Sequence, residues 1–457
     1  MKVFSTHIFA TSTTHQMHLK TIFNRVTEYK PFVVEHVVLV EHDTGPTIEI
    51  SMRARENGQP TCSKCGDRCA GYDAAPTVRH FEFIPLWMIP VVLVYTMRRV
   101  QCPRCGVKVE SVPWAEGKSR LTTAYKWFLA GWARRMSWKE VGVSFRVSRD
   151  HVYNSVKHAV SWGLSHRSLD DIESIGVDEI QWQKGHKYQT VVYQIDEGRK
   201  RLLWVGPDRT AKTLLRFFRS LGKDRTENLQ FVCSDRWQAS LKVIAKKAPQ
   251  AIHILDRFHV MQKMSKAIDK VRAAEVKQML ADGYEPLLIG CRWLLLKRRE
   301  NLSDNQAAKL KDLLQYNLKS VRSHLMKEDF QRFWTYTYPA WAGKFLDEWC
   351  TRAMRSRIEP MQAMARTLRN KRELLLNWFR ADGQLSSGVV EGFNNKLKLI
   401  TRKSYGFRTQ NAYETALYHN LADLPMPNFT HCFFCGGCFL AIEAIALLRE
   451  CESREYS

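Results

Sequence analysis

Three acidic residues far apart in the sequence have neighbours that suggest a chemical role. Asp178 lies within the apolar run "IGVDEIQW", where a core strand would ordinarily exclude a charge. Asp235 ends "LQFVCSD", at the point where the chain leaves a predicted strand. Glu391 is the only acid in "SSGVVEGFNNKLKLITRKSYGFR", a predicted helix whose later residues include five Lys or Arg. Three converging carboxylates would offer the oxygen ligands that two Mg²⁺ (or Mn²⁺) ions prefer.

The predicted secondary structure can bring these acids together. Residues 173–183, 187–197 and 199–208 are strand-like runs separated by turn residues, which predicts a meander. Alternating helix and strand follow, with strands in "LQFVCSD" and "AIHILD". This is the element order of a ribonuclease-H-like core. In that topology the first and fourth strands are neighbours, so Asp178 and Asp235 can meet, and the late helix would bring Glu391 across the same end of the sheet.

Such a site suits phosphodiester chemistry. Two divalent ions about 3.5–4 Å apart activate the attacking oxygen and neutralise the charge that develops on the leaving oxygen. A basic helix beside them can hold the phosphate backbone of DNA, since residues three and four apart share one helix face. The predicted DNA-binding residues of this helix are Asn394, Asn395, Lys396, Lys398, Arg402 and Lys403.

Each acid also has an ordinary explanation. An Asp at the end of a strand is often a turn or helix cap, and Glu391 can be an acid favoured at a helix start by the macrodipole. Glu179, which would point to the opposite face of the strand, is a rival to Asp178. Asp256 is a rival to Asp235. The order of the acids, on strand one, strand four and a late helix, favours the metal-binding interpretation.

Two C-x-x-C pairs, Cys62/Cys65 and Cys102/Cys105, lie in a segment of short β-branched and aromatic runs. Four thiolates can close a tetrahedral structural Zn²⁺ site. The 36 residues between the pairs exceed the usual spacing, so buried free thiols remain an alternative. Cys69 and His80 are possible substitute ligands. The pairs indicate a zinc ribbon in a reducing compartment, and we expect the protein in the cytoplasm.

A helical segment follows the cysteine pairs. Ser137 and Glu140 have the spacing of a capping box, and Ser148 can cap the next helix after a short turn. Two short helices joined in this way suit a helix-turn-helix, although any small helical linker has the same periodicity. The charge of the chain favours DNA binding, because 70 Lys and Arg against 46 Asp and Glu give a net charge of +24. The predicted contacts of the second helix are Arg149 and Lys157.

The fold class is therefore multidomain, α+β and α/β. No stretch has the length of a convincing membrane span, and no long basic amphipathic helix or lipidation signal indicates a membrane surface. The expected domains are an N-terminal extension (1–32), a zinc-ribbon β domain (33–115), a helix-turn-helix (118–166), the first part of the core (170–275), a helical insertion (276–380), the closing helices of the core (381–425) and an apolar, Cys-rich tail (426–457).

The sequence resembles insertion-sequence transposases of the DDE type, specifically the ISL-three family. The resemblance is carried by "GVDEIQWQKGHKYQTVVYQID", "VCSDRWQASLKVIAKKAPQAIHILDRFHVMQKMSKAIDKVR" and "GVVEGFNNKLKLITRKSYGFR", and it extends over roughly residues 17–429. It implies that Asp178, Asp235 and Glu391 are the catalytic and magnesium-binding triad. The "DRFH" segment resembles an Asp-x-x-His signature of related superfamilies, which implies an accessory role for Asp256 and His259.

The resemblance also implies double-stranded DNA partners, namely the terminal inverted repeats of the element and target DNA, bound by a homodimer or higher oligomer at the nucleoid. A non-catalytic DNA-binding regulator and a nuclease that cuts without joining are the alternatives. The tail departs from the family pattern. It contains Cys432, Cys435, Cys438 and Cys451 and is either a third metal knuckle or an extension beyond the natural end.

Overall fold

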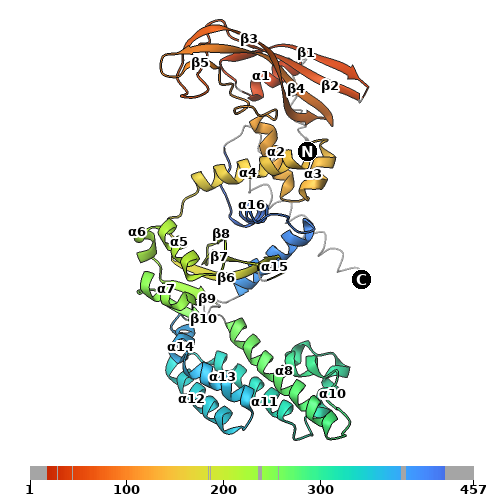
Figure 1. The fold of residues 1–457 in the computed structure, drawn as a ribbon, viewed down its shortest axis with the longest axis vertical. Coiled ribbons are helices and arrows are strands. Elements are labelled where there is room, and N and C mark those ends of the chain that lie inside the picture. The colour runs from red at the N-terminus through yellow and green to blue at the C-terminus, as the bar shows by residue number, and fades with distance from the viewer. Residues whose placement is uncertain are drawn as a thin grey trace, which may run out of the picture. The chain divides into compact units, whose positions relative to one another are not determined.

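The computed structural model describes residues 18–427 except 28, 44, 184, 186, 235–238, 256 and 382–387 (Figure 1). The chain divides into two compact units. The N-terminal unit holds the described residues up to 167 together with 424–427, and the core unit is Ser168–Asp423. None of the helices in the described residues is long and apolar enough to cross a membrane. Asp235, Asp256 and the predicted tail beyond 427 lie outside these residues.

The N-terminal unit begins with a β domain whose sheet has the strand order β1-β2-β4-β3, with β5 paired to β4. Strands β2 and β4 are parallel, and the other pairs are antiparallel. The core of this domain surrounds Trp114, which is 1% exposed and makes an edge contact with Phe32 at 4.7 Å. Its elements are α1 (Leu19–Thr27), β1 (Phe32–His42), β2 (Gly45–Ala54), β3 (Ala70–Leu86), β4 (Ile89–Cys102) and β5 (Gly106–Val109).

Helix α1 lies within residues 1–32, which the sequence assigns to an extension. Its Phe23 ring packs edge-on against Phe83 of β3, with the ring centroids 5.3 Å apart, and against Tyr29 at 6.3 Å. Leu19, Ile22, Phe23 and Val26 recur at the i, i+3, i+4 and i+7 spacing of an amphipathic helix, so its periodicity could have revealed it. Burial of one aromatic side chain against the sheet explains why these residues belong to the β domain.

Three helices complete the N-terminal unit: α2 (Thr123–Ala133), α3 (Trp138–Ser144) and α4 (Arg149–His166). The predicted capping box at the start of α3 is confirmed, because Ser137 accepts from the Glu140 N–H and the Glu140 carboxylate accepts from the Ser137 N–H. Ser148 caps α4 by accepting from the His151 N–H at 3.2 Å. Local capping therefore fixes where both helices begin.

The core unit contains a mixed sheet with the strand order β10-β9-β6-β7-β8. Strands β6, β7 and β8 form the predicted antiparallel meander, and β9 and β10 are added in parallel. The expected pairing of the first strand with the fourth is confirmed. The strands are β6 (Ser174–Gln183), β7 (Lys187–Asp196), β8 (Arg199–Gly206), β9 (Phe231–Ser234) and β10 (Ile252–Leu255).

Helices cover both faces of this sheet (Figure 1). On one face α5 (Ala211–Leu221) and α7 (Ala239–Lys247) pack on the apolar side chains of the strands, and α6 (Lys223–Glu227) follows α5. On the other face lie α15 (Gly388–Lys403) and α16 (Gln410–Leu421), and the backbone N–H of Val205 in β8 donates to the Tyr418 hydroxyl of α16 at 3.0 Å.

A helical block lies between β10 and α15 in the sequence. The predicted boundary between residues 275 and 276 falls inside α8, whose buried side chains from Val260 to Val271 already belong to the core of the block. The block consists of α8 (Arg257–Ala281), α9 (Arg292–Leu296), α10 (Asp304–Leu313), α11 (Lys319–Gln331), α12 (Pro339–Arg355), α13 (Glu359–Arg369) and α14 (Arg372–Arg380), with 3-10 helices η1 (Arg299–Asn301) and η2 (Arg332–Thr335).

The close packing at the joint of α3 and α4 depends on Gly142. A Cβ atom at this position would lie 2.8 Å from the backbone oxygen of Val147, whose own N–H donates to the Gly142 carbonyl. In an open helix a Gly→Ala change stabilises by about 1 kcal/mol. Here we expect Gly142→Ala to destabilise the joint by about 1–3 kcal/mol through overpacking. Hydrogen exchange of the α3 and α4 amides in the full chain measures this change.

The neighbouring Val143→Ala is the matched control, since that side chain is 73% exposed. This control should change the free energy of opening, as measured by hydrogen exchange, by no more than about 0.5 kcal/mol. Equal or slower exchange in Gly142→Ala would contradict the tight joint.

Candidate functional site

Asp178 lies on the α15 side of the sheet and is only 3% exposed. Its neighbour Val177 belongs to the apolar cluster under α5 and α7, so alternation along β6 directs Asp178 to the opposite face. One carboxylate oxygen accepts from the Glu179 N–H at 2.7 Å. Acids are rarely buried in the middle of a sheet, so this position makes Asp178 a candidate for a functional role.

Helix α15 is anchored on this same face. The Phe393 ring stacks on the Tyr193 ring, with centroids 4.4 Å apart and planes 6° from parallel. Tyr193 is paired across the sheet with Gly176, two residues before Asp178. Glu391 lies in the first turn of α15, two residues before Phe393, and only its backbone is described. The structure thus brings the helix that carries Glu391 to the strand that carries Asp178.

The other two predicted acids, Asp235 and Asp256, directly follow the ends of β9 and β10 in the sequence. Ser234, the last residue of β9, pairs with Val177, and Asp235 follows it outside the described residues. Leu255 likewise ends β10 directly before Asp256. His259 is half-buried in the first turn of α8, with its ring 5.5 Å from that of Phe258.

A buried hydrogen bond connects the ends of β9 and β10. The Ser234 hydroxyl and His253 Nε2 are 2.7 Å apart. Burial, with a smaller contribution from Lys371, lowers the pKa of His253 to about 4, so the imidazole is neutral at pH 7. Asn377 of α14 donates to the His253 carbonyl at 2.8 Å and ties the helical block to this edge. Sequence reasoning missed this pair, although both residues are polar positions within apolar strands.

Two more buried polar side chains lie on the Asp178 face. Gln189 pairs with Ile180, and Tyr193 with Gly176, so both point to the same side as Asp178. Within the described part of the chain, neither the Gln189 amide nor the Tyr193 hydroxyl has a hydrogen-bond partner. Burial raises the pKa of Tyr193 well above its usual value and keeps the phenol neutral. Unpaired buried polar atoms beside a carboxylate fit a site that holds an ion with its ordered water.

A groove of about 460 Å³ runs between the later half of β6 and α15. Lys398 and Arg402, one turn apart on α15, are among its lining residues. The groove is lined by Glu179, Ile180, Gln181, Leu397, Lys398, Thr401, Arg402 and Tyr413. It therefore offers cations next to the strand of Asp178.

The other predicted DNA-binding residues of α15 are placed as follows. Asn395 and Lys396 are exposed, and Lys403 is half-buried. The Lys396 ammonium lies 6.0 Å from the Phe393 ring centre. The Asn394 side chain lies outside the described part of the structure.

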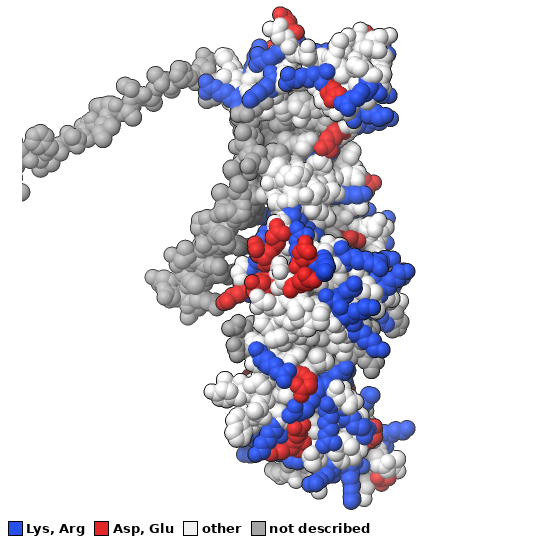
Figure 2. Space-filling view, turned by 90° about the vertical axis from the view of Figure 1, so that its left-hand side faces the viewer, with Lys and Arg blue, Asp and Glu red and all other residues white. Residues whose placement is uncertain are grey.

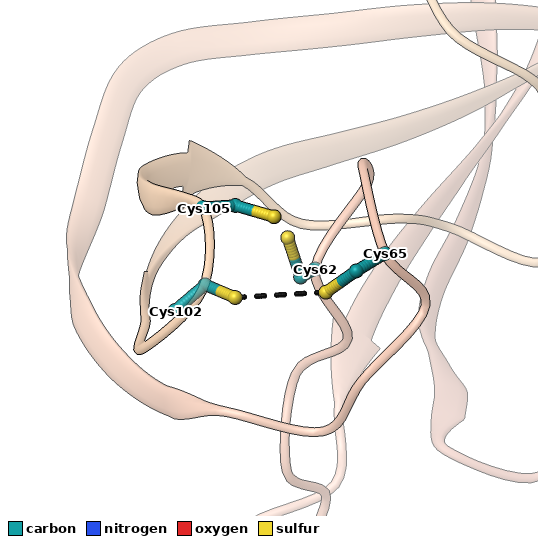
Figure 3. A group of neighbouring side chains, drawn as sticks. All are labelled: Cys62, Cys65, Cys102 and Cys105. Atoms are coloured by element: carbon teal, nitrogen blue, oxygen red, sulfur yellow. Dashed lines mark hydrogen bonds between the residues drawn. The ribbon is translucent and has the colours of Figure 1, made fainter.

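The four predicted zinc ligands meet in the N-terminal unit. The sulfur atoms of Cys62, Cys65, Cys102 and Cys105 all lie within 4.8 Å of one another (Figure 3), and neither Cys69 nor His80 belongs to this group. Gly66 and Gly106, which follow the two pairs, have φ of 78° and 71°, as tight turns there require. Four sulfur donors at this spacing suit a structural zinc ion.

Backbone amides at the second turn favour a thiolate. Burial raises the pKa of the Cys102 thiol, but hydrogen bonds from the backbone N–H groups of Arg104 and Cys105, together with those from the Cys65 and Cys62 thiols, outweigh it, and the pKa falls to about 6. The sulfur atoms of Cys65 and Cys102 are 3.5 Å apart (Figure 3). The turn thus prepares the charged form that binds metal.

Helix α4 exposes a polar surface near its start. The predicted contacts Arg149 and Lys157 are both exposed, and Asn154, which sequence reasoning missed, is exposed three residues before Lys157. That i, i+3 spacing is the signal that could have found it. A hollow of about 280 Å³ beside this start is lined by Lys139, Gly142, Val143, Arg146, Val147 and Arg149.

Comparison with known proteins gives concordant results. The model of the ISL-three transposase family matches residues 175–417. The transposase of insertion sequence element IS1001 from Bordetella parapertussis is 30% identical over 388 residues, which cover 84% of this chain and 94% of that protein. The transposase of element IS1557 from Mycobacterium tuberculosis is 29% identical over 411 residues, covering 84% and 91%.

The family match spans more than half of the chain, from β6 to α16. The Bordetella relative, at 30% identity, is matched over nearly its whole length. The chain therefore belongs to the ISL-three family of insertion-sequence transposases.

Proposed function

We propose that this transposase cleaves DNA at the terminal inverted repeats of its element and joins the freed ends to target DNA, using Asp178, Asp235 and Glu391 in a ribonuclease-H-like core. The observation that carries the proposal is the buried Asp178 on the sheet face covered by α15. The pairing of Ser234 with Val177 supports Asp235 as the second acid, because the chain leaves β9 beside β6.

The three carboxylates would hold two Mg²⁺ or Mn²⁺ ions, which supply activation of the attacking oxygen and neutralisation of the leaving oxygen. Water attacks a phosphodiester at the element end, and the bond to the 3′ oxygen breaks. The freed 3′-hydroxyl then attacks a phosphodiester of target DNA: its oxygen forms a new bond to phosphorus, the bond from that phosphorus to the 3′ oxygen of the target strand breaks, and the target strand leaves with a 3′-hydroxyl. Lys398 and Arg402 in the groove bind phosphate oxygens and keep the strand in line with the acids.

We assign the recognition of the ends to the N-terminal unit. A zinc ion held by the four cysteines would fix the turns of the β domain, and α4 would enter the major groove as the second helix of a helix-turn-helix. Asp256 and His259 are assigned an accessory role next to the core. The protein would act as a homodimer or higher oligomer on DNA, in the cytoplasm at the nucleoid.

Two other functions share most of these features. A non-catalytic DNA-binding regulator would keep the N-terminal unit and dispense with the acids. The presence of Asp178, Asp235 and Glu391 together argues against it, since a regulator does not need the three acids. A nuclease that cuts without joining would keep the acids, and only an assay for joined products separates it from a transposase.

The acids are tested by strand cleavage and joining on a labelled inverted-repeat end with Mg²⁺. We expect Asp178→Asn and Glu391→Gln to keep end binding and to lower cleavage by about 10²–10³-fold or more, because each removes a charge that stabilises the transition state. Glu173→Gln is the control, an exposed acid just before the start of the same strand. An active Asp178→Asn together with an inactive Glu179→Gln would show that the neighbour is the true ligand.

The cysteine site is tested by metal content. We expect Cys62→Ser to lose its zinc and to speed hydrogen exchange in β3 to β5, because a structural zinc site contributes directly to folding free energy. Cys69→Ser changes a buried cysteine outside the four-sulfur group and should retain the metal. A fully folded Cys62→Ser protein without zinc would refute a structural role.

The α4 surface is tested by binding to an inverted-repeat duplex and to an unrelated duplex. We expect Asn154→Ala to weaken binding to the repeat alone, by about 1–3 kcal/mol, as loss of a base contact does. Lys157→Gln should weaken binding to both duplexes alike through loss of a phosphate contact. Ser161→Ala, one turn further along α4, is the control. Unchanged repeat binding in both variants would move recognition away from α4.

A further inference from the structure

Helices α5 and α7 carry a basic surface that the proposed site does not use. Their inward side chains, among them Leu214, Phe217 and Ile244, are buried against the sheet face opposite to α15. Their outward side chains include six cations and no acid: Lys212, Arg216, Arg219, Lys242, Lys246 and Lys247. We call these six side chains the α5/α7 basic surface.

The cations of this surface are available for a ligand. All six are exposed, and none forms an ion pair with an acid that the structure describes. Arg216 lowers the pKa of one described acid, Asp208, but no ion pair joins the two, and the Asp208 Oδ1 atom accepts hydrogen bonds from Thr210 and Thr213. In the helical block, by contrast, Arg352 is paired with Asp329 and Arg372 with Asp347.

The spacing of the cations suits a phosphate backbone. Lys212, Arg216 and Arg219 recur at i, i+4 and i+7 and so form one row about 10 Å long on α5. Packed helices lie about 8–10 Å apart, so α7 supplies a second row at a similar distance. Successive phosphates of one DNA strand are about 3.4 Å apart along the duplex axis, so one row of cations spans about three phosphates.

The composition of the surface argues against a protein partner and against sequence-specific DNA contacts. Among the described residues of these two helices, no large apolar side chain is exposed, whereas protein interfaces are depleted of charge at their centre. The outward cations are joined by few side chains that could distinguish bases. The chemistry therefore fits contact with phosphates rather than with base edges.

We propose that the α5/α7 basic surface binds a second DNA duplex without sequence preference, on the face of the core unit opposite to the α15 groove. Figure 2 shows Lys and Arg gathered on one side of the middle part of the molecule, beside an area in which Asp and Glu predominate. Such separation of charge would direct a duplex to the basic side. The role of this duplex as target DNA rests on the proposed function. Its binding to the α5/α7 basic surface does not.

The test uses the full chain and two probes, a 60-base-pair duplex of arbitrary sequence and a short duplex that carries one element end. The variant is Lys212→Gln/Arg216→Gln/Arg219→Gln. The slope of log K against log salt on the arbitrary duplex should fall in magnitude by about 0.9 for each lost phosphate contact, or roughly 2.7 in all. Cleavage of the short end should stay at the wild-type rate, and joining to a plasmid target should fall at least tenfold.

The matched control is Lys277→Gln/Lys309→Gln/Lys311→Gln, which removes the same charge from exposed helix positions of the helical block. It should leave the slope unchanged. A second variant, Lys242→Arg/Lys246→Arg/Lys247→Arg, keeps the charge and should retain binding.

An unchanged slope in the α5 variant, with normal joining, would overturn the proposal, as would an altered oligomeric state with normal DNA binding. If the wild type cuts no DNA but the slope still falls in the variant, the surface stands while the proposed catalytic function fails.

Discussion

The cost of burying the Asp178 carboxylate is the constraint on which the core unit depends. A charge in the middle of a sheet is tolerated only where other groups compensate it. Asp178 accepts a hydrogen bond from the Glu179 N–H. The same face also holds the Gln189 amide and the Tyr193 hydroxyl, which lack hydrogen-bond partners among the described residues, and α15 closes over them through the stack of Phe393 on Tyr193. The same contact that covers the acid also places the first turn of α15, with Glu391, at this face. Stability and proposed catalysis thus depend on one packing contact.

The helical block takes part in this arrangement although it is a long insertion. It begins directly after β10 and ends shortly before α15, so it joins the two elements that border the face of Asp178. Asn377 binds the backbone of His253, and Leu255 of β10 belongs to the apolar cluster of the block. His253 in turn binds Ser234 at the end of β9. A change in the packing of the block would therefore reach the strand end that precedes Asp235, which gives the insertion a structural role in the site.

Charge is divided among parts of the protein with different proposed tasks. The groove beside β6 has Lys398 and Arg402 close to the acids, whereas α4 combines the cations Arg149 and Lys157 with Asn154, a side chain that can recognise bases. The α5/α7 basic surface has cations and almost nothing else. A net charge of +24 is thus distributed over surfaces that differ in how much sequence information they can take from DNA.

The sequence by itself determined the features that depend on near neighbours. The capping box of Ser137 and Glu140, the cap at Ser148, the strands of the meander and the turn glycines after each C-x-x-C pair involve residues a few positions apart, so local chemistry dictates them. Tertiary structure alone decided contacts between distant segments. Arg201 looks like a surface cation, yet it is fully buried and donates to Gln194 and to the Ser168 carbonyl. The Ser234–His253 bond and the stack of Phe393 on Tyr193 are of the same kind, because their partners meet only once the sheet has formed and its faces are covered.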